Sequence, residues 1–461
     1  MMASPTNLTD FLAPFSIDTK TVHSLSHKFT FNFQKVAAES ETQFLPTPIT
    51  ESILQSSSST VQNNDRYLAI DIGGTNLRVA FVQPSSSSSS QPTLHSHTSH
   101  TFPSHLKSSP DLLFSWIGSH IANLLLSLPP SSSSVPLGVA FSFPMAQTSL
   151  SQAKIMQMGK GFGIAQEHQD LATQIIRGYE RHRTTTTTTT TTALPELKVV
   201  AILNDAVATY ITAVNKFGRK AGMGLIVGTG CNATIPLGVE SLGANKTLGL
   251  ELGGGDSKGD AVVVINTEWS ISGTVEPLKE MRIITRWDEE LDSGVEIPGF
   301  QPLEYMTGGR YLGELVRIVY LGWLELKGVK VEGEEEEERF KKSYAIGSEE
   351  LSKGKEVEGD LLEVVLAVQR RAAGIVAAAT VGLLRFGGRL SGKDEEEEDE
   401  VVVGYTGGCI EYFQNYLEDT QRFIDEILEM EGSKVKVVLK PCNDGGIIGA
   451  GVLAGAALRS Q

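Results

Sequence analysis

The stretch that decides the fold is YLAIDIGGTNLRVAFV, which runs from Tyr67 to Val82. Two runs rich in apolar and β-branched residues, Tyr67–Ile72 and Leu77–Val82, flank the tripeptide Gly73-Gly74-Thr75. This order predicts a strand, a tight turn and a second strand. The pattern is open to two interpretations, because Gly-Gly between apolar runs also occurs in ordinary hairpins.

The functional interpretation of this turn is phosphate binding. Gly73 and Gly74 allow positive φ and carry no Cβ, so backbone N–H groups can close around a phosphate. The side chains of Thr75 and Asn76 would add donors. Asp71, at the end of the first strand, could hold Mg²⁺ through water.

A second segment repeats this pattern in the other half of the chain. GMGLIVGTGCNATIPL places Gly228, Thr229 and Gly230 between two apolar runs. A phosphate turn that recurs once per half indicates two duplicated lobes around a shared cleft.

Two more glycine-rich segments follow. VVVGYTGG ends in Gly407-Gly408, and NDGGIIGAGVLAGAAL begins a helix at Gly445-Gly446. Glycines at a helix N-terminus permit close backbone approach to an anionic group. The alternative is close packing between helices through small residues.

One carboxylate stands where α/β proteins hold reactive groups. The apolar run Lys198–Leu203 is followed by Asn204-Asp205 and then by a helical pattern, so Asp205 lies at a strand end and a helix start. It could be a helix N-cap, or it could accept the proton of a hydroxyl that attacks a γ-phosphoryl group. Lys160, in MGKGF, is the candidate for a charge-neutralising lysine.

Strands and helices alternate along the chain. The leading segment Leu8–Val36 has helical spacing. The segments are predicted strands at Tyr67–Ile72, Leu77–Val82, Leu137–Phe143, Val199–Leu203, Gly224–Val227 and Val401–Gly404, and predicted helices at Pro110–Leu128, Leu171–Arg183, Ala206–Phe217, Gly309–Leu326 and Leu361–Leu384. This alternation predicts an α/β protein of two lobes.

Charge is uneven along the 461 residues. The net charge is −16, but thirteen acidic residues lie in the tracts Glu332–Glu338 and Asp394–Glu400, and the rest of the chain has a balance of −3. Because clustered Lys and Arg are lacking, we expect no nucleic-acid partner. These tracts and the Ser and Thr runs, Thr184–Thr192 among them, are expected to be surface loops with too little apolar area to order themselves.

Location and metal binding can also be addressed from the sequence. The Met1–Asp10 segment has no secretory pattern, and the three cysteines have no disulfide or zinc spacing, so we expect a cytoplasmic protein. The apolar stretch Ala372–Phe386 is too short to span a membrane, and we expect a buried helix instead. His95, His97, His100 and His105 lie in a Ser/Pro-rich stretch with no carboxylate or cysteine nearby, so we expect no metal there.

Taken together, these motifs resemble the hexokinase family within the actin-like ATPase superfamily. DIGGTNLRV is similar to the family's first phosphate motif, and FSFPMAQ with GKGF to its sugar-binding signature. LNDAVAT, VGTGCNA, INTEW and GFQPLEYMTGGRYLGELVR follow in the family's order. The resemblance implies a two-lobed, ribonuclease H-like fold with a small lobe at 8–213, which includes the leading helical segment. It also implies a large lobe at 220–458, whose last helix packs back toward the small one.

The resemblance also implies roles for individual residues. Asp205 would be the general base for the sugar 6-hydroxyl, with Lys160 beside it. The sugar site would comprise Ser142, Phe143, Pro144, Lys160, Asn204, Asp205, Asn232, Glu268 and Glu304. The nucleotide site would comprise Asp71, Gly73, Gly74, Thr75, Asn76, Gly228, Thr229, Gly230, Gly407, Gly408, Gly445 and Gly446. The implied cofactors are ATP and Mg²⁺, the partners are sugar and ATP alone, and the protein would be a monomer or homodimer without membrane attachment.

Three departures from the family pattern fall inside these motifs. Gly159 replaces the threonine of Trp-Thr-Lys-Gly-Phe, Ser270 replaces a glycine, and Thr406 stands where the family has the aspartate of Asp-Gly-Ser. Such changes resemble atypical fungal members, some similar to N-acetylglucosamine kinases and some to regulatory proteins. We therefore predict a kinase for glucose or a related hexose, with an N-acetylglucosamine kinase and a weakly active sugar sensor as alternatives.

Overall fold

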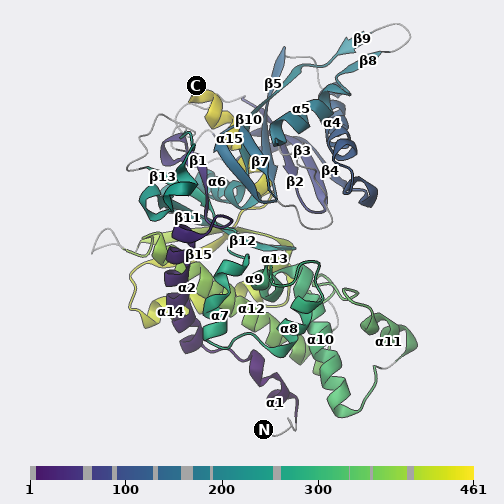
Figure 1. Cartoon of the computed structure of the whole chain (residues 1–461), viewed down its shortest axis with the longest axis vertical. Helices are drawn as coiled ribbons and strands as arrows, with labels where there is room; N and C mark the ends of the chain where they lie inside the picture. The colour runs from purple at the N-terminus through teal and green to yellow at the C-terminus, as the bar shows by residue number, and fades with distance from the viewer. Residues whose placement is uncertain are drawn as a thin grey trace. The chain divides into compact units, whose positions relative to one another are not determined.

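The structure is a computed structural model and describes residues 7–54, 65–85, 91–127, 133–156, 170–186, 191–252, 261–331, 333–352, 357–391 and 399–460. The chain forms two compact units. Unit 1 comprises 1–44, 225–233 and 267–441, and unit 2 comprises 45–224, 234–266 and 442–461. Both are mixtures of helices and sheets (Figure 1). The compact units differ from the lobes predicted at 8–213 and 220–458, because both ends of the chain belong with segments distant in sequence.

Unit 2 is built on a five-stranded sheet of order β10-β5-β2-β3-β4. β2 pairs with β5, and β5 with β10, in parallel, whereas β2, β3 and β4 are antiparallel neighbours. The strands are β2 (Tyr67–Ile72), β3 (Asn76–Gln83), β4 (Thr93–Thr101), β5 (Ser134–Phe141) and β10 (Glu196–Leu203). A separate two-stranded sheet is formed by β6 (Met145–Ser149) and β7 (Gln152–Ile155).

Helices cover both faces of this sheet. Leu68, Ile70 and Ile72 of β2 share one core with α4 (Pro110–Leu126) and α5 (Leu171–Glu180). Tyr67 and Ala69 belong to a second core with α6 (Asp205–Phe217) and α15 (Gly445–Arg459). Because side chains of a strand alternate between faces, Asp71 falls on the side of α6 and α15.

A six-stranded sheet has the order β1-β13-β12-β11-β14-β15. Its strands are β1 (Leu45–Thr50), β11 (Ala221–Val227), β12 (Cys231–Gly238), β13 (Val262–Asn266), β14 (Glu400–Thr406) and β15 (Lys436–Pro441). β1 and β13 belong to unit 2, β14 and β15 belong to unit 1, and the unit boundaries fall within β11 and β12. The turn between β11 and β12 is the second glycine turn of the sequence.

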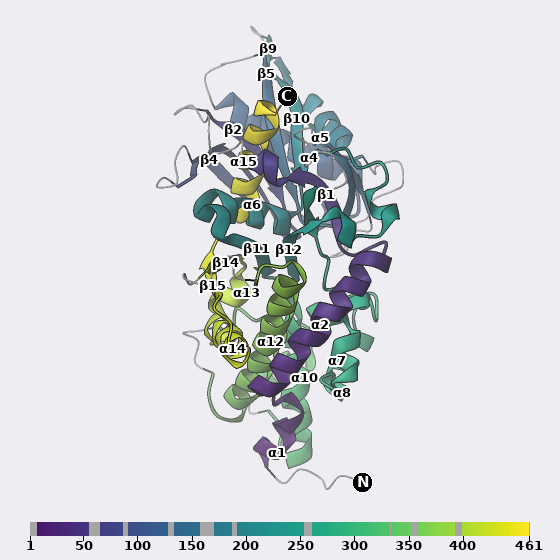
Figure 2. The ribbon, with the colours of Figure 1, turned by 90° about the vertical axis from the view of Figure 1, so that its left-hand side faces the viewer.

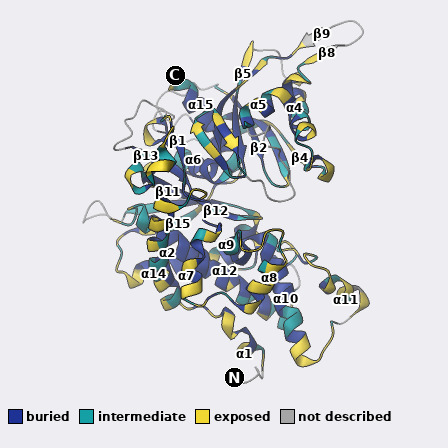
Figure 3. Cartoon of the chain, in the orientation of Figure 1, coloured by how far each residue is buried: buried dark blue, intermediate teal, exposed yellow. Residues whose placement is uncertain are grey.

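Unit 1 is helical around α12 (Gly359–Phe386), a core helix that packs against α2 (Thr19–Glu39), α10 (Gly309–Lys327) and α14 (Tyr416–Met430) (Figures 2 and 3). The other helices are α1 (Leu8–Leu12), α7 (Glu276–Glu280), α8 (Arg286–Ser293), α9 (Pro302–Thr307), α11 (Glu334–Lys341) and α13 (Gly408–Tyr412). By length and composition α12 could cross a membrane, but 83% of its most apolar window is buried inside the protein. The prediction of a buried helix is confirmed.

Arg371 of α12 is the largest polar side chain in this core. Its guanidinium donates to both carboxylate oxygens of Asp288 in α8, at 2.7 and 2.6 Å. Asp288 also accepts from the backbone N–H of Thr285 at 2.7 Å, as part of a capping box at the start of α8. The buried charges are therefore paired, as burial requires.

The predicted strands and long helices are confirmed, with ends that shift by a few residues, but the described parts of two low-complexity tracts are not loops. Thr184–Thr186 and Thr191–Ala193 pair as strands β8 and β9, because β-branched threonine favours extended backbone. Glu334–Glu338 lies in α11, where Glu336 pairs with Arg339 and Glu337 with Lys341. The prediction of loops was wrong there because it weighed only burial and not local propensity. The Ser runs lie mostly outside the described residues.

Candidate active site

In unit 2, three parallel strands end side by side and carry predicted site residues. Asp71 of β2 pairs with Ala140 of β5, and Ala140 pairs with Leu203 of β10. Asp71 therefore lies level with the strand end that leads into Asn204 and Asp205. The carboxyl ends of parallel strands are where open α/β sheets gather their reactive groups.

Asn204, not Asp205, is the N-cap of α6. The backbone N–H of Ala206 donates to Asn204 Oδ1 at 2.8 Å, and Asn204 has extended backbone angles. Asp205 is the first helical residue, and its Oδ1 accepts from the same N–H at 2.8 Å. Asn204 is buried, whereas Asp205 is partly exposed. Capping alone therefore does not account for a carboxylate at position 205, which leaves it available for proton transfer.

Asp71 is surrounded by other charges. Burial raises the pKa of Asp71 to about 7, Arg78 opposes this rise, and the negative charges of Asp205 and Asp444 add to it. Arg78 of β3 donates to Asp444 Oδ1 at 3.0 Å, and Asp444 has a left-handed backbone with φ 55° just before α15. Sequence reasoning missed Arg78 and Asp444, although both lie within quoted motifs.

Three carboxylates against one guanidinium suit a divalent cation. Asp71 and Asp444 offer the hard oxygen ligands that Mg²⁺ prefers, and the charge of Asp205 adds to the negative potential; burial is the main cause of the raised pKa of Asp71, and a cation would favour its ionised form. These residues would hold Mg²⁺ through water. The arrangement is consistent with the predicted role of Asp71.

The first glycine turn is a hairpin between β2 and β3. The backbone N–H of Gly73 donates to the Asn76 carbonyl at 3.0 Å, and Asn76 Oδ1 accepts from Thr101 at 2.9 Å. Thr75 is exposed. Lys107 donates from Nζ to the Gly74 carbonyl at 3.0 Å, which places an ammonium group at the turn. Sequence reasoning missed Lys107 because it lies outside every motif.

Gly445 and Gly446 begin α15, as predicted. A Cβ on Gly446 would lie 2.6 Å from Asp71 Oδ2, and one on Gly445 would lie 3.0 Å from Thr209 Oγ1 of α6. Thr212 of α6 also donates to the Gly445 carbonyl at 3.0 Å. Close helix packing therefore explains Gly445, whereas Gly446 makes room for a charged site residue.

The sugar signature follows β5. The backbone N–H of Ser142 donates to the Ile72 carbonyl at 3.0 Å, so this segment lies beside the end of β2. Phe143 is buried, and its ring contacts that of Phe141, while Ser142 and Pro144 are partly exposed. Lys160 and the rest of GKGF lie outside the described residues.

In unit 1, the second and third glycine turns are in contact. Gly407 has φ 130°, and a Cβ there would lie 2.3 Å from the Val227 carbonyl oxygen. A Cβ on Gly228 would lie 3.5 Å from the Gly407 Cα. Two hydrogen bonds fix the turn at Gly228. The Gly228 N–H donates to the Gly230 carbonyl at 2.9 Å, and the Gly228 carbonyl accepts from the Gly309 N–H at 2.8 Å. The Thr229 carbonyl likewise accepts from the Arg310 N–H. Gly408 is the first residue of α13.

The unit 1 residues assigned to sugar lie close to the second turn. Glu304 of α9 is buried, and its Oε2 accepts from the Cys231 N–H at 3.1 Å. Asn232 Oδ1 accepts from Thr267 Oγ1 at 3.4 Å, and Glu268 follows Thr267 directly. Asn232, Glu268 and Glu304 are thereby brought together around β12.

Glu268 has an unusual backbone. Its φ is 44°, which is rare for a residue with a Cβ. Its carbonyl accepts from Gln43 Nε2 at 3.0 Å and from the Ile271 N–H at 3.1 Å, so two hydrogen bonds hold the strained turn. Strain at a buried carboxylate is consistent with a functional position.

Two departures from the family pattern are accommodated locally. Ser270 is buried and donates its hydroxyl to the Cys231 carbonyl. Thr406 ends β14 directly before Gly407, so the backbone turn survives the loss of an aspartate. The third departure, Gly159, lies outside the described residues.

Comparison with known proteins decides the family. Two hexokinase family models match residues 7–214 and, in two overlapping parts, 222–364 and 360–456. The chain belongs to the hexokinase family. It is thus a sugar kinase by family, a phosphotransferase with a hydroxyl acceptor.

Similar hexokinases cover most of the chain. Hexokinase-2 of Solanum tuberosum is 26% identical over 84% of this chain and 79% of its own length. Hexokinase-7 of Oryza sativa subsp. japonica is 28% identical over 85% of this chain and 84% of its own length. The structure of a hexokinase from Schistosoma mansoni complexed with glucose matches with a TM-score of 0.77 and 23% identity, over 97% of this chain and 98% of that one. The predicted two-lobed actin-like fold is confirmed.

Proposed function

We propose that this hexokinase-family protein transfers the γ-phosphoryl group of MgATP to the 6-hydroxyl of glucose or a related hexose, as an entry step to carbohydrate breakdown in the cytoplasm. The observation that carries this proposal is the position of Asp205. It begins α6 beside Asp71, while Asn204 provides the N-cap. A partly exposed carboxylate at a strand end, beside an asparagine that already caps the helix, suits a general base.

Each group of residues then has a chemical task. Asp205 accepts the proton of the attacking hydroxyl, and Asp71 and Asp444 would hold the Mg²⁺ that accompanies ATP. Bound ATP would supply the phosphoryl group, and its Mg²⁺ would neutralise the negative charge of the phosphate oxygens. Lys107 and the N–H groups of the first turn bind phosphate oxygens. Asn232, Glu268 and Glu304 bind ring hydroxyls, and a sugar that lacks those hydroxyls would leave them unpaired.

A coupled assay of ADP release tests the activity. Purified full-length protein is supplied with MgATP and with glucose, fructose, mannose or N-acetylglucosamine in turn. We expect turnover with glucose and the related hexoses. Turnover confined to N-acetylglucosamine would identify the alternative kinase of this fold. Sugar binding without turnover on any of the four would refute the kinase and favour the sensor.

The base is tested by Asp205→Ala. We expect the kcat to fall by about 10²- to 10⁴-fold, the usual contribution of a general base, with sugar affinity within about tenfold of wild type. Asp170→Ala is the matched control, because Asp170 caps α5 of the same unit by accepting from Thr173 at 2.7 Å. Activity that survives Asp205→Ala, or that falls equally in both variants, would show that Asp205 is not the base.

A further inference from the structure

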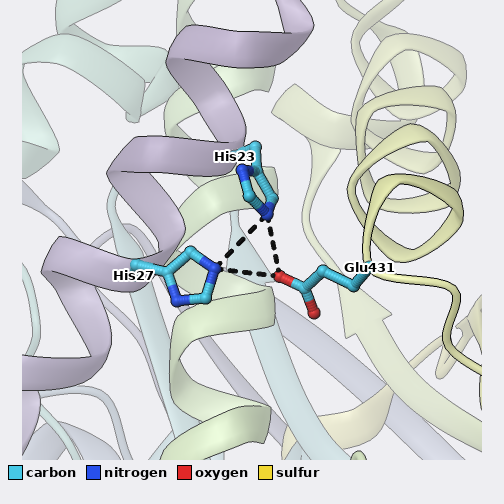
Figure 4. A group of neighbouring side chains, drawn as sticks. All are labelled: His23, His27 and Glu431. Carbon is cyan, nitrogen blue, oxygen red and sulfur yellow. Dashed lines mark hydrogen bonds and ion pairs between the residues drawn. The ribbon is translucent and has the colours of Figure 1, made fainter.

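Two histidines and a glutamate meet in unit 1, and none of them is among the residues assigned to the kinase reaction. His23 and His27 are four residues apart on α2, so they lie on one face of the helix. Glu431 follows α14 directly as its C-cap residue. Both imidazole rings point toward the Glu431 carboxylate (Figure 4).

The three ligand atoms form a nearly equilateral triangle. Nε2 of His23 and Nε2 of His27 are 3.3 Å apart, and each is 3.2 Å from Glu431 Oε1. A triangle of these edges is one face of a tetrahedron whose centre lies about 2.0 Å from each corner, which is the usual Zn–N and Zn–O distance. The side chains therefore already have the spacing of three ligands around one four-coordinate ion.

Hydrogen bonding alone is a poor account of this arrangement. Arg385, at the end of α12, also donates to Glu431 Oε1, at 2.6 Å, so three nitrogen groups approach one oxygen. The Nε2–Nε2 contact cannot be a hydrogen bond when both nitrogens donate to the carboxylate. A cation that accepts electron pairs from all three atoms removes this conflict.

The surroundings of the cluster allow an ion to enter. Arg385 has other partners, Thr30 Oγ1 at 3.0 Å and Ser26 Oγ at 3.4 Å, to which it can remain bonded if it leaves Glu431. The side chains are 25%, 44% and 22% exposed for His23, His27 and Glu431, so an ion and a water ligand can enter from solvent.

We propose that His23, His27 and Glu431 form a zinc site, completed by a water molecule, that fixes α2 to the end of α14. Two imidazoles and one carboxylate in tetrahedral spacing favour Zn²⁺ over Mg²⁺ or Ca²⁺, which need more oxygen ligands. In this site Zn²⁺ takes the place of the Arg385 guanidinium at Glu431 Oε1. The site lies wholly in unit 1 and is separate from the carboxylates of unit 2 that serve Mg²⁺.

Direct binding tests this site. Full-length protein without a histidine tag is stripped with a chelator and titrated with Zn²⁺, and bound metal is counted after gel filtration. We expect one zinc per chain and a higher melting temperature. Co²⁺ in place of Zn²⁺ should give the strong visible absorption of a four-coordinate ion, a readout that needs no variant. Failure to bind Zn²⁺, or a weak octahedral Co²⁺ spectrum, would overturn the proposal.

Variants locate the bound ion. His27→Ala and Glu431→Gln should each weaken Zn²⁺ binding by at least about tenfold, since even outer-shell changes have that effect. His97→Ala is the matched control, an exposed histidine on β4 of the other unit, and should bind zinc like wild type. Arg385→Gln should tighten binding, because it removes the competing cation. Zinc affinity unchanged in His27→Ala and Glu431→Gln would place the metal elsewhere and overturn the proposal, and unchanged or weaker binding in Arg385→Gln would overturn the exchange.

Discussion

Replacement of Asp71 by asparagine should make the protein more stable and less active. In the folded protein the pKa of Asp71 is about 7, whereas its ordinary value is 3.8. Between these two values the folded protein keeps a proton that the unfolded chain has lost. The free energy of unfolding therefore falls by about 1.4 kcal/mol per pH unit as the pH rises through this window, and then stays level.

The expected gain follows from the width of that window. A shift of this size corresponds to about 4 kcal/mol at most, and because Asp71 is partly exposed we expect about 2 to 4 kcal/mol. The free energy of unfolding of Asp71→Asn should match that of wild type near pH 4, where both folded proteins have a neutral side chain at position 71. Above pH 7 it should exceed the wild-type value by about 2 to 4 kcal/mol. Millimolar Mg²⁺ should reduce the difference, because a bound cation stabilises the ionised carboxylate.

Urea denaturation at a series of pH values measures this effect. Asp65→Asn is the matched control, since it removes one charge just before the same strand. Kinetic assays at pH 8 should show that Asp71→Asn raises the requirement for Mg²⁺. A stability difference between Asp71→Asn and wild type that is equally large at pH 4.5 and pH 8, or that is absent at both, would refute the electrostatic reasoning.

Three other predictions concern single sites. Gly407→Ala should cost about 1 to 3 kcal/mol of stability by urea denaturation and raise the KM for ATP, because the new Cβ meets the Val227 carbonyl at positive φ; unchanged values for both would contradict the close contact. Lys107→Ala should raise the KM for ATP several-fold at unchanged melting temperature, with exposed Lys20→Ala as control; equal KM values in the two variants would contradict a phosphate role. Asp288→Ala should lower the free energy of unfolding by about 3 to 5 kcal/mol, because it leaves Arg371 buried without its carboxylate; a loss below about 1 kcal/mol would show that Arg371 finds another partner.

Local sequence patterns located the strands and helices that were predicted, but β1, β4, β13, β15 and α14 were not predicted. Alternation in Tyr67–Ile72 places Leu68, Ile70 and Ile72 in one core and Tyr67 and Ala69 in another, as a strand between two helical layers requires. The family's motifs likewise marked Asn204, Asp205 and Glu304. These are features that neighbouring residues encode by themselves.

The residues that were missed act across long separations. Asp444 meets Arg78 through a contact between β3 and the start of α15, and no motif joins the two positions. Lys107 reaches the first turn from a segment without any motif. The pairing of His23 and His27 was visible at helical spacing, but Glu431 and Arg385 come from two other helices. Such clusters depend on tertiary packing, which periodicity does not describe.

The position of α15 has a consequence for synthesis of the chain. This helix contacts β2, β3, β5, β10 and α6, yet it leaves the ribosome after all of unit 1. Until then, the side of the sheet that carries Tyr67 and Ala69 has no α15 to cover it, and Asp444 cannot reach Arg78, 366 positions earlier. The part of this face that α15 covers is therefore without its partner throughout elongation, when chaperones can bind it, and the contact between Asp444 and Arg78 forms only with α15.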